Sequence, residues 1–215
     1  MEITEITENI KNIRETLPEG VTLVCVSKFQ PPEAITEAYE AGERDFGESR
    51  VRELCEKYEA LPKDIRWHFI GHLQTNKVRQ IVPFVHLIQS VDSIHLLQLI
   101  NREAARAHRI VNILLEVHTS NEPSKSGFSP EEIPSVIPIL PQFKFLKVCG
   151  LMTMATNTDD AEEVHRCFRM LKQMADEQGL GDGILSYGMS EDYHLAIEDG
   201  SNMVRIGSKI FGERK

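Results

Sequence analysis

The chain has 215 residues, of which 24 are lysine or arginine and 33 are aspartate or glutamate, so its formal net charge is -9. This acidic balance argues against a broad nucleic-acid interface, because clustered cations hold phosphate backbones. Hydrophobic residues make up 41% of the chain, yet no uninterrupted apolar run reaches the roughly 18 residues of a membrane-spanning helix. The composition therefore predicts a soluble globular protein.

The cysteines and the N-terminal segment bear on the compartment. None of the four cysteines forms a C-x-x-C pair, and Cys25 and Cys149 lie in apolar runs, where a thiol behaves as a small hydrophobe. We therefore expect reduced thiols. The N-terminal segment has no basic region followed by an apolar stretch, so it is not a secretory signal. Together these features predict a cytoplasmic protein.

After a leading helix, apolar runs typical of strands alternate with segments of helical spacing. The predicted strands cover residues 21–27, 44–48, 66–70, 85–91, 111–118, 143–154, 184–189 and 203–207. The segments between them read as helices at 31–42, 48–61, 75–84, 93–109, 159–178 and 190–200, with a further helix after 129.

Local signals mark several helix ends. Pro32 suits a first helical turn and Gly42 a stop, and Gly179 ends the segment at 159–178. Ser93 is placed as an N-cap, and the segment SPEEI at 129–133 has the pattern of a capping box.

Regular alternation of strands and helices predicts parallel strands joined by crossover helices, and about eight such units close a barrel. We therefore predict an α/β fold: a single-domain (β/α)8 TIM barrel over residues 1–215 with an extra N-terminal helix. An open doubly wound sheet is the alternative, but it usually carries a glycine-rich turn after the first strand, and here that turn is SKFQPP.

Barrel geometry directs attention to the carboxyl ends of the strands, where barrel sites form. Lys28 directly follows the first strand and shares a face with Val24 and Val26 by alternation. If that face points inward, its amine lies at the barrel mouth above an apolar floor and can form a Schiff base with an aldehyde. The plain alternative is a lysine that begins a solvated loop.

Polar residues after the last two strands suggest a phosphate site. Ser190 looks like an N-cap after strand seven, and exposed amides at a helix start bind anions. Gly207 permits close approach of a ligand to the backbone, and Ser208 offers a hydroxyl. Arg205 lies inside a strand and needs a buried partner. Such sites often form after strands seven and eight.

Other chemistries find little support. His68 and His72 flank a strand end rather than one helical turn, and His118 suits a rim position, so no metal site is predicted. There is no Ser–His–Asp order and no Walker-type loop.

The motifs VSKFQP, RDFGES, WHFIGHLQTNK, SKSGF, GLMTMA and YGMSEDYHLAIEDGSNMVRIGSKIFGER follow one another from about Val21 to the C-terminus. This series resembles the pyridoxal-phosphate homeostasis protein family (YggS/PROSC type). The resemblance implies a barrel like the N-terminal domain of bacterial alanine racemase, with pyridoxal 5'-phosphate as cofactor.

The resemblance also implies roles for individual residues. Lys28 would hold the cofactor as a Schiff base, and Arg205 would face the pyridine nitrogen. Ser190, Gly207 and Ser208 would bind the phosphate. Met189 of the same G-M-S motif, Ile70 and Met152 would contribute to the cofactor pocket.

This chain departs from the family pattern after strand two, where Ser49 replaces the usual asparagine of G-E-N. Ser49 is shorter, so we expect a contact near the cofactor ring to be lost or replaced by water. The turn Phe29-Gln30 also differs from the commoner polar residues. Lys125 could carry a second, transient Schiff base, although an exposed loop lysine is the simpler interpretation.

The preferred hypothesis is a noncatalytic protein that binds pyridoxal phosphate reversibly and delivers it to apoenzymes. An arginine at the pyridine nitrogen keeps that atom unprotonated and makes the cofactor a weak electron sink. Neither Tyr187 nor Tyr193 is placed as the second base that a racemase needs. The sequence ends soon after strand eight, so we expect the C-terminal β-domain of alanine racemase, with its dimer interface, to be absent and the protein to be a monomer. The alternatives are a small amino-acid racemase or lyase, and an aldolase-type barrel without cofactor.

Overall fold

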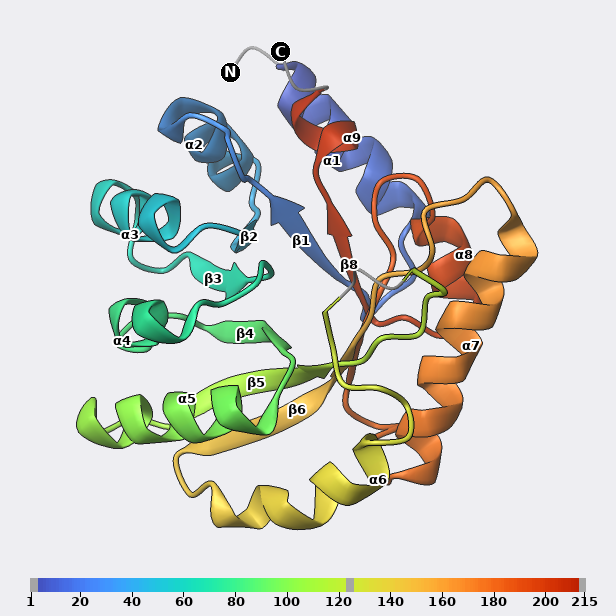
Figure 1. Ribbon diagram of the computed structural model, residues 1–215. Coiled ribbons are helices and arrows are strands. Elements are labelled where there is room, and N and C mark those ends of the chain that lie inside the picture. The colour runs from blue at the N-terminus through green and yellow to red at the C-terminus, as the bar shows by residue number, and fades with distance from the viewer. Residues whose placement is uncertain (1–3, 123–125, 213–215) are drawn as a thin grey trace.

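In the computed structural model, which describes residues 4–122 and 126–212, eight strands form one closed barrel. Each strand pairs in parallel with the next along the chain, and the last pairs with the first. The strands are β1 (Thr22–Val26), β2 (Asp45–Glu48), β3 (Arg66–Phe69), β4 (Leu87–Val91), β5 (Val111–Glu116), β6 (Leu146–Met152), β7 (Ile184–Ser186) and β8 (Met203–Ile206). The predicted (β/α)8 barrel is thus confirmed (Figure 1).

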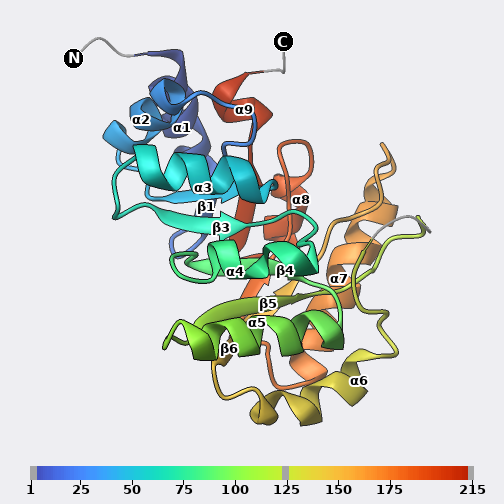
Figure 2. The same cartoon turned by 60° about the vertical axis from the view of Figure 1, so that its left-hand side comes forward.

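Helices surround the barrel on the outside. They are α1 (Glu5–Thr16), α2 (Pro32–Glu40), α3 (Val51–Ala60), η1 (Thr75–Lys77), α4 (Val78–Ile81), α5 (Ile94–Arg106), α6 (Ile133–Val136), η2 (Ile137–Gln142), α7 (Ala161–Glu177), α8 (Tyr193–Glu198) and α9 (Ser208–Phe211). Figure 2 shows α3, α4 and α5 stacked along one side. The extra N-terminal helix α1 packs beside α9, where Asn9 Nδ2 donates to the carbonyl of Ile210 at 3.1 Å.

Apolar side chains form two cores because strand residues alternate between the two faces of the barrel wall. The larger core lies between strands and helices and includes Trp67, Phe69 and Phe168. The smaller one fills the barrel interior with Val24, Leu87, Leu114, Met152 and Met203. The interior core forms the floor beneath the carboxyl ends of the strands.

Most predicted helix signals are confirmed, one forms in part, and one is wrong. Ser93 caps α5, its Oγ accepting from Leu96 N at 3.2 Å. The predicted capping box at 129–133 forms in part: Glu132 Oε2 accepts from Ser129 N at 2.7 Å, Glu132 N donates to the carbonyl rather than the side chain of Ser129, and α6 begins at Ile133. Prolines within the next turns tighten the continuation into the 3₁₀ helix η2.

Ser190 is not the N-cap of α8. That position is Asp192, whose carboxylate instead accepts from the backbone N–H of Met189 at 2.6 Å. The helix α8 therefore begins two residues later than the sequence pattern suggests. The hydroxyl of Ser190 is then available for another partner.

The cysteines are thiols, as the sequence predicts. Cys25, Cys55, Cys149 and Cys167 are all free cysteines. Within the described residues, no helix combines the length and the apolarity that crossing a membrane requires.

Candidate functional site

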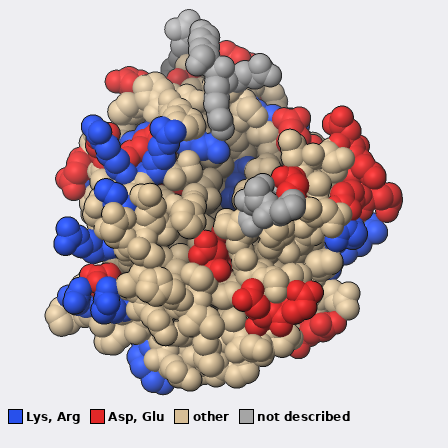
Figure 3. Space-filling view, viewed as in Figure 1, with Lys and Arg blue, Asp and Glu red and all other residues tan. Residues whose placement is uncertain are grey.

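A cavity of about 670 Å³ opens at the carboxyl ends of the strands. Its walls come from both ends of the chain, from the segment after β6 and from the loop before α8. Figure 3 shows this face hollowed near its centre, with basic atoms in the hollow and acidic side chains gathered on the side of α7. Lys28, Ser49, Ile70, Met189, Ser190, Arg205, Gly207 and Ser208 all line it.

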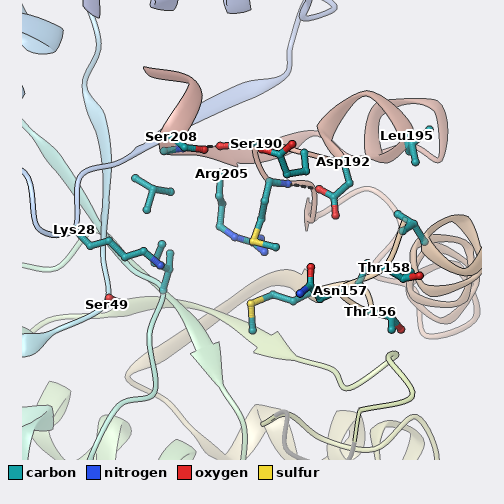
Figure 4. Close-up of a pocket in the computed structure, with 18 of the residues that line it drawn as sticks. Lys28, Ser49, Thr156, Asn157, Thr158, Ser190, Asp192, Leu195, Arg205 and Ser208 are labelled. Carbon is teal, nitrogen blue, oxygen red and sulfur yellow. Dashed lines mark hydrogen bonds between the residues drawn. The ribbon is translucent and has the colours of Figure 1, made fainter. Parts of the chain in front are cut away.

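Lys28 reaches into this cavity from the end of β1 (Figure 4). Val24 belongs to the interior core and Val26 lines the cavity, so the alternation that the sequence predicted for this strand is confirmed. Lys28 is partly buried. An amine in this place has an apolar floor below it and the open cavity in front.

The backbone turns sharply directly after Lys28. Phe29 has φ 66°, a left-handed conformation that non-glycine residues adopt only when their surroundings impose it. Its N–H donates to Glu53 Oε1 at 2.5 Å, and the guanidinium of Arg50 lies 4.6 Å from the centre of its ring. These contacts hold the turn that aims Lys28.

A buried ion network lies beneath this turn. Lys57 Nζ donates to Glu48 Oε1 at 2.7 Å, to Glu53 Oε1 at 2.6 Å and to the carbonyl of Ser27 at 2.7 Å. Ser27 Oγ also donates to Glu48 at 2.6 Å. Burial raises the pKa of Glu48, while Lys57 and Ser27 oppose that shift. The network therefore holds the backbone on both sides of Lys28, through the carbonyl of Ser27 and through the bond from Phe29 N to Glu53.

Arg205 reaches the cavity from β8 (Figure 4) and is only 4% exposed. Its Nη1 donates to the carbonyl and to Oγ of Ser186 at 2.9 and 2.6 Å, and its Nη2 donates to the carbonyl of Thr153 at 3.0 Å. A guanidinium has five N–H donors, so Nε–H and one Nη2–H have no partner among the described residues.

Burial lowers the pKa of Arg205 to about 10, and the carboxylates of Asp192 and Glu116 oppose the shift. The guanidinium is therefore still cationic at neutral pH. A buried cation with unused donors beside a cavity fits a ligand that offers an acceptor atom at that point.

The residues with expected phosphate contacts lie at one edge of the cavity. In Figure 4, Ser190 and Ser208 lie next to each other, opposite Thr156, Asn157 and Thr158. Ser190 Oγ accepts from Gly207 N at 3.2 Å, which joins the two loops after β7 and β8. Hydroxyl groups and the first amides of a helix are donors that suit an anion.

Two methionines on the inward face of β6 and its extension differ in depth. Met152 is 1% exposed and lies in the interior core, while Met154 lines the cavity. Inward-facing residues of a barrel strand lie in successive layers along the barrel axis. Met154 therefore lies in the layer that lines the cavity, where the resemblance had placed Met152.

Several lining residues escaped sequence reasoning. They are the loop residues Thr156, Asn157, Thr158 and Asp159 and the acidic pair Glu191 and Asp192. The loop follows directly after the GLMTMA motif at the carboxyl end of a strand. That position could have predicted that these residues line the site. Lys125 lies outside the described residues.

The tyrosines and histidines take no part in the cavity wall as described. Tyr187 Oη donates to the carbonyl of Asp199 at 2.7 Å, and Tyr193 Oη lies 3.1 Å from Thr16 Oγ1. His118 does not line the cavity either.

The opposite end of the barrel brings together Asp45, His68 and His86, whose ligand atoms lie within 4.8 Å of one another. The sequence analysis considered His68 together with His72, and it did not predict that His68 lies beside Asp45 and His86. Asp45 is already engaged by His68 and by two hydrogen bonds from Arg66, so the carboxylate is committed to structural contacts.

The model of the alanine racemase N-terminal domain family matches residues 2–215 of the chain. The pyridoxal phosphate homeostasis protein of Aquifex aeolicus is 38% identical over 221 residues, which cover 99% of this chain and 97% of that protein. This chain belongs to the pyridoxal phosphate homeostasis protein family. Its relative of the same name from Synechocystis is 40% identical and covers 93% of this chain and 94% of its own.

Solved structures agree with this assignment to the family. PipY of Synechococcus elongatus without pyridoxal phosphate has a TM-score of 0.92 at 36% identity, covering 96% of this chain and all of that one. The PipY structure with pyridoxal phosphate bound has a TM-score of 0.89. An alanine racemase of Clostridium difficile shares the fold, with a TM-score of 0.79 at 17% identity, and this chain spans 57% of it.

Proposed function

We propose that this protein binds pyridoxal 5'-phosphate reversibly through a Schiff base at Lys28 and serves as a noncatalytic carrier in its homeostasis. The observation that carries the proposal is the pair of Lys28 and Arg205 facing one cavity from β1 and β8. The unused buried donors of Arg205 fit the pyridine nitrogen, which is a hydrogen-bond acceptor. The relatives named for pyridoxal phosphate homeostasis support the choice of ligand.

Each neighbouring residue has a role in this proposal. Ser190 and Ser208 would hold the phosphate through their hydroxyl groups, and Gly207, whose N–H binds Ser190 Oγ, would let the phosphate approach the backbone closely. Ile70 and Met189 would contact the ring, and Ser49 would lie beside it. Met154 would take the ring contact assigned to Met152 by the resemblance, while Met152 supports the floor from below.

When bound, the cofactor supplies an aldehyde that reacts reversibly with amines. The residues of this chain favour storage over turnover. Arg205 is a permanent donor and would keep the pyridine nitrogen unprotonated. Among the described residues, the cavity wall carries no tyrosine or histidine that could act as a second base opposite Lys28. This arrangement supports a carrier more than a racemase or lyase.

We also propose a compartment, a class of recipients and an oligomeric state for this protein. Free thiols suit a reducing compartment, which supports a cytoplasmic location. The recipients would be apoenzymes that need pyridoxal phosphate, and the carrier would work as a monomer. Sedimentation of the loaded protein tests the last point, with a single species of the 24.4 kDa chain expected.

The decisive experiment separates carrier from enzyme. Protein loaded with pyridoxal phosphate is incubated with an apo-aminotransferase, and in parallel with L-alanine or L-serine. A carrier restores aminotransferase activity and leaves the enantiomers unchanged, and Lys28→Ala loses the covalently held cofactor. Racemisation by the wild type that is absent in Lys28→Ala would show that the protein is an amino-acid racemase rather than a carrier.

A further inference from the structure

A chain of buried hydrogen bonds crosses the barrel interior and ends at Arg205. Arg205 Nη1 donates to Ser186 Oγ at 2.6 Å, and Ser186 Oγ donates to Gln89 Oε1 at 2.6 Å. Gln89 Nε2 lies 2.9 Å from His68 Nδ1, and His68 Nε2 lies 2.9 Å from Asp45 Oδ1. None of these five residues, which we call the interior relay, is more than 7% exposed.

The interior relay connects the two ends of the barrel. Asp45 opens β2 and lies beside a second cavity of about 230 Å³ at the amino ends of the strands, where Arg66 also binds its carboxylate. The other members come from β3, β4, β7 and β8, and Arg205 lines the main cavity. The relay is therefore the polar counterpart of the apolar interior core.

Every hydrogen bond in the relay has one possible direction. The guanidinium of Arg205 can only donate, and the ionised carboxylate of Asp45 can only accept. Gln89 Nε2 also donates to Met203 Sδ at 3.3 Å, so its amide nitrogen faces His68 and its oxygen faces Ser186. His68 then accepts at Nδ1 and donates from Nε2, which assigns one tautomer to the ring.

We propose that Ser186, Gln89 and His68 are positioning residues that hold the guanidinium of Arg205 in the orientation which leaves its unused donors facing the cavity. This inference rests on the proposed function, in which those donors meet the pyridine nitrogen. A hydrogen-bonded network among buried side chains allows few rearrangements, because each alternative leaves a buried polar atom unpaired.

The test compares two ligands that differ at one atom. Pyridoxal phosphate and its analogue with C–H in place of the pyridine nitrogen share the aldehyde and the phosphate, and only the first can accept a hydrogen bond from Arg205. A positioned guanidinium should make the wild type favour pyridoxal phosphate by roughly 10- to 100-fold, the range expected for one hydrogen bond to a charged group. The measurement is the dissociation constant of each ligand by absorption titration.

Variants of the relay should remove this preference. Ser186→Ala deletes the link to Arg205, and Gln89→Met breaks the chain one step farther away with little change in volume. Each should lower the ratio to about threefold or less. Ser201→Ala is the matched control: its buried hydroxyl lies within hydrogen-bond distance of the backbone carbonyls of Leu185, Tyr187 and Met203, the nearest being that of Tyr187 at 2.7 Å, and it does not contact the relay.

The outcomes separate the two proposals. A ratio that stays at the wild-type value in folded Ser186→Ala and Gln89→Met overturns the positioning role while the proposed function stands. A wild type that binds both ligands equally overturns the placement of Arg205 at the pyridine nitrogen. A wild type that binds neither ligand overturns the proposed function.

A measurement on the protein without ligand tests the relay independently. Nitrogen-15 shifts of the imidazole should show His68 as the Nε2–H tautomer near neutral pH, and Gln89→Met should move the shift of Nδ1, while Ser201→Ala leaves it in place. An Nδ1–H tautomer or a doubly protonated ring would contradict the direction of the relay.

Discussion

Lys57 joins two carboxylates inside the protein, so its loss should be costly. Lys57→Met leaves Glu48, which is fully buried, without its cation, and we expect the free energy of unfolding to fall by about 3–5 kcal/mol. The measurement is equilibrium unfolding in urea. Adding Glu48→Gln to Lys57→Met should recover part of the loss, because it removes the unpaired charge.

The matched control for Lys57 is an exposed ion pair on the same helix. Arg52 and Glu56 are both largely exposed, so Arg52→Met should change the free energy of unfolding by about 0.5 kcal/mol or less. An effect of Lys57→Met as small as that of Arg52→Met would show that the network does not hold the turn.

Asp45 makes the stability of the protein depend on pH. Burial opposes ionisation of its carboxyl, but hydrogen bonds from Arg66 and His68 outweigh burial and hold the pKa of Asp45 far below its usual value. A carboxyl with a lowered folded-state pKa stabilises the fold above its unfolded pKa of about 4 and loses that contribution as the pH falls further.

We therefore expect the difference in unfolding free energy between wild type and Asp45→Asn to shrink as the pH is lowered from about 7 to 3. Urea unfolding at several pH values measures it. A difference that grows towards low pH would mean that Asp45 is not held in its ionised form by these contacts.

At the level of secondary structure, Gly150 permits the pairing of β6 with β7. It has φ +151°, and a Cβ there would lie 2.0 Å from the carbonyl oxygen of Ile184. Gly150→Ala should therefore destabilise the barrel by about 3 kcal/mol or more. Gly179→Ala is the control, since Gly179 also has positive φ but nothing within 4 Å, and it should cost about 1 kcal/mol. Equal losses in thermal unfolding would argue against the steric explanation.

The strands were largely predictable, because period and β-branched composition mark them. Every predicted strand segment contains a strand, including the weak one at β2. The errors lie at the ends: the strand predicted at 143–154 begins only at Leu146, and the one at 184–189 ends at Ser186. Apolar residues such as Phe143 belong to the turn before β6, and apolar content alone does not separate a strand from its approach.

For the molecule as a whole, ligand binding should raise thermal stability. At about 100 times its dissociation constant a ligand adds about 2.7 kcal/mol, which corresponds to a rise in Tm of about 5–10 °C for a chain of this size. Without ligand, Lys28→Ala should melt within about 2 °C of the wild type, because Lys28 lies at the mouth rather than in the core. A large drop for the ligand-free variant would assign Lys28 a structural role.

The closed barrel and the cluster at its mouth follow from strand count and strand ends, which the sequence displays. The interior relay and the network around Lys57 do not, because their members are brought together only by closure of the barrel. Gln89 and Ser186 lie 97 residues apart in the chain and are joined by one hydrogen bond. Polar residues inside apolar runs indicate that a buried hydrogen bond is needed, but the sequence does not show which residue will be the partner.

The proposed function depends on a covalent bond between pyridoxal phosphate and Lys28, and peptide mapping after borohydride reduction detects that bond. Wild type and Lys28→Ala are mixed with pyridoxal phosphate, reduced, digested and examined by mass spectrometry. We predict that the wild type absorbs visible light, bleaches on reduction and carries the phosphopyridoxyl group on Lys28, while the variant stays unlabelled. A colourless wild type, or the label on another lysine with Lys28 unmodified, would show that Lys28 does not form the Schiff base.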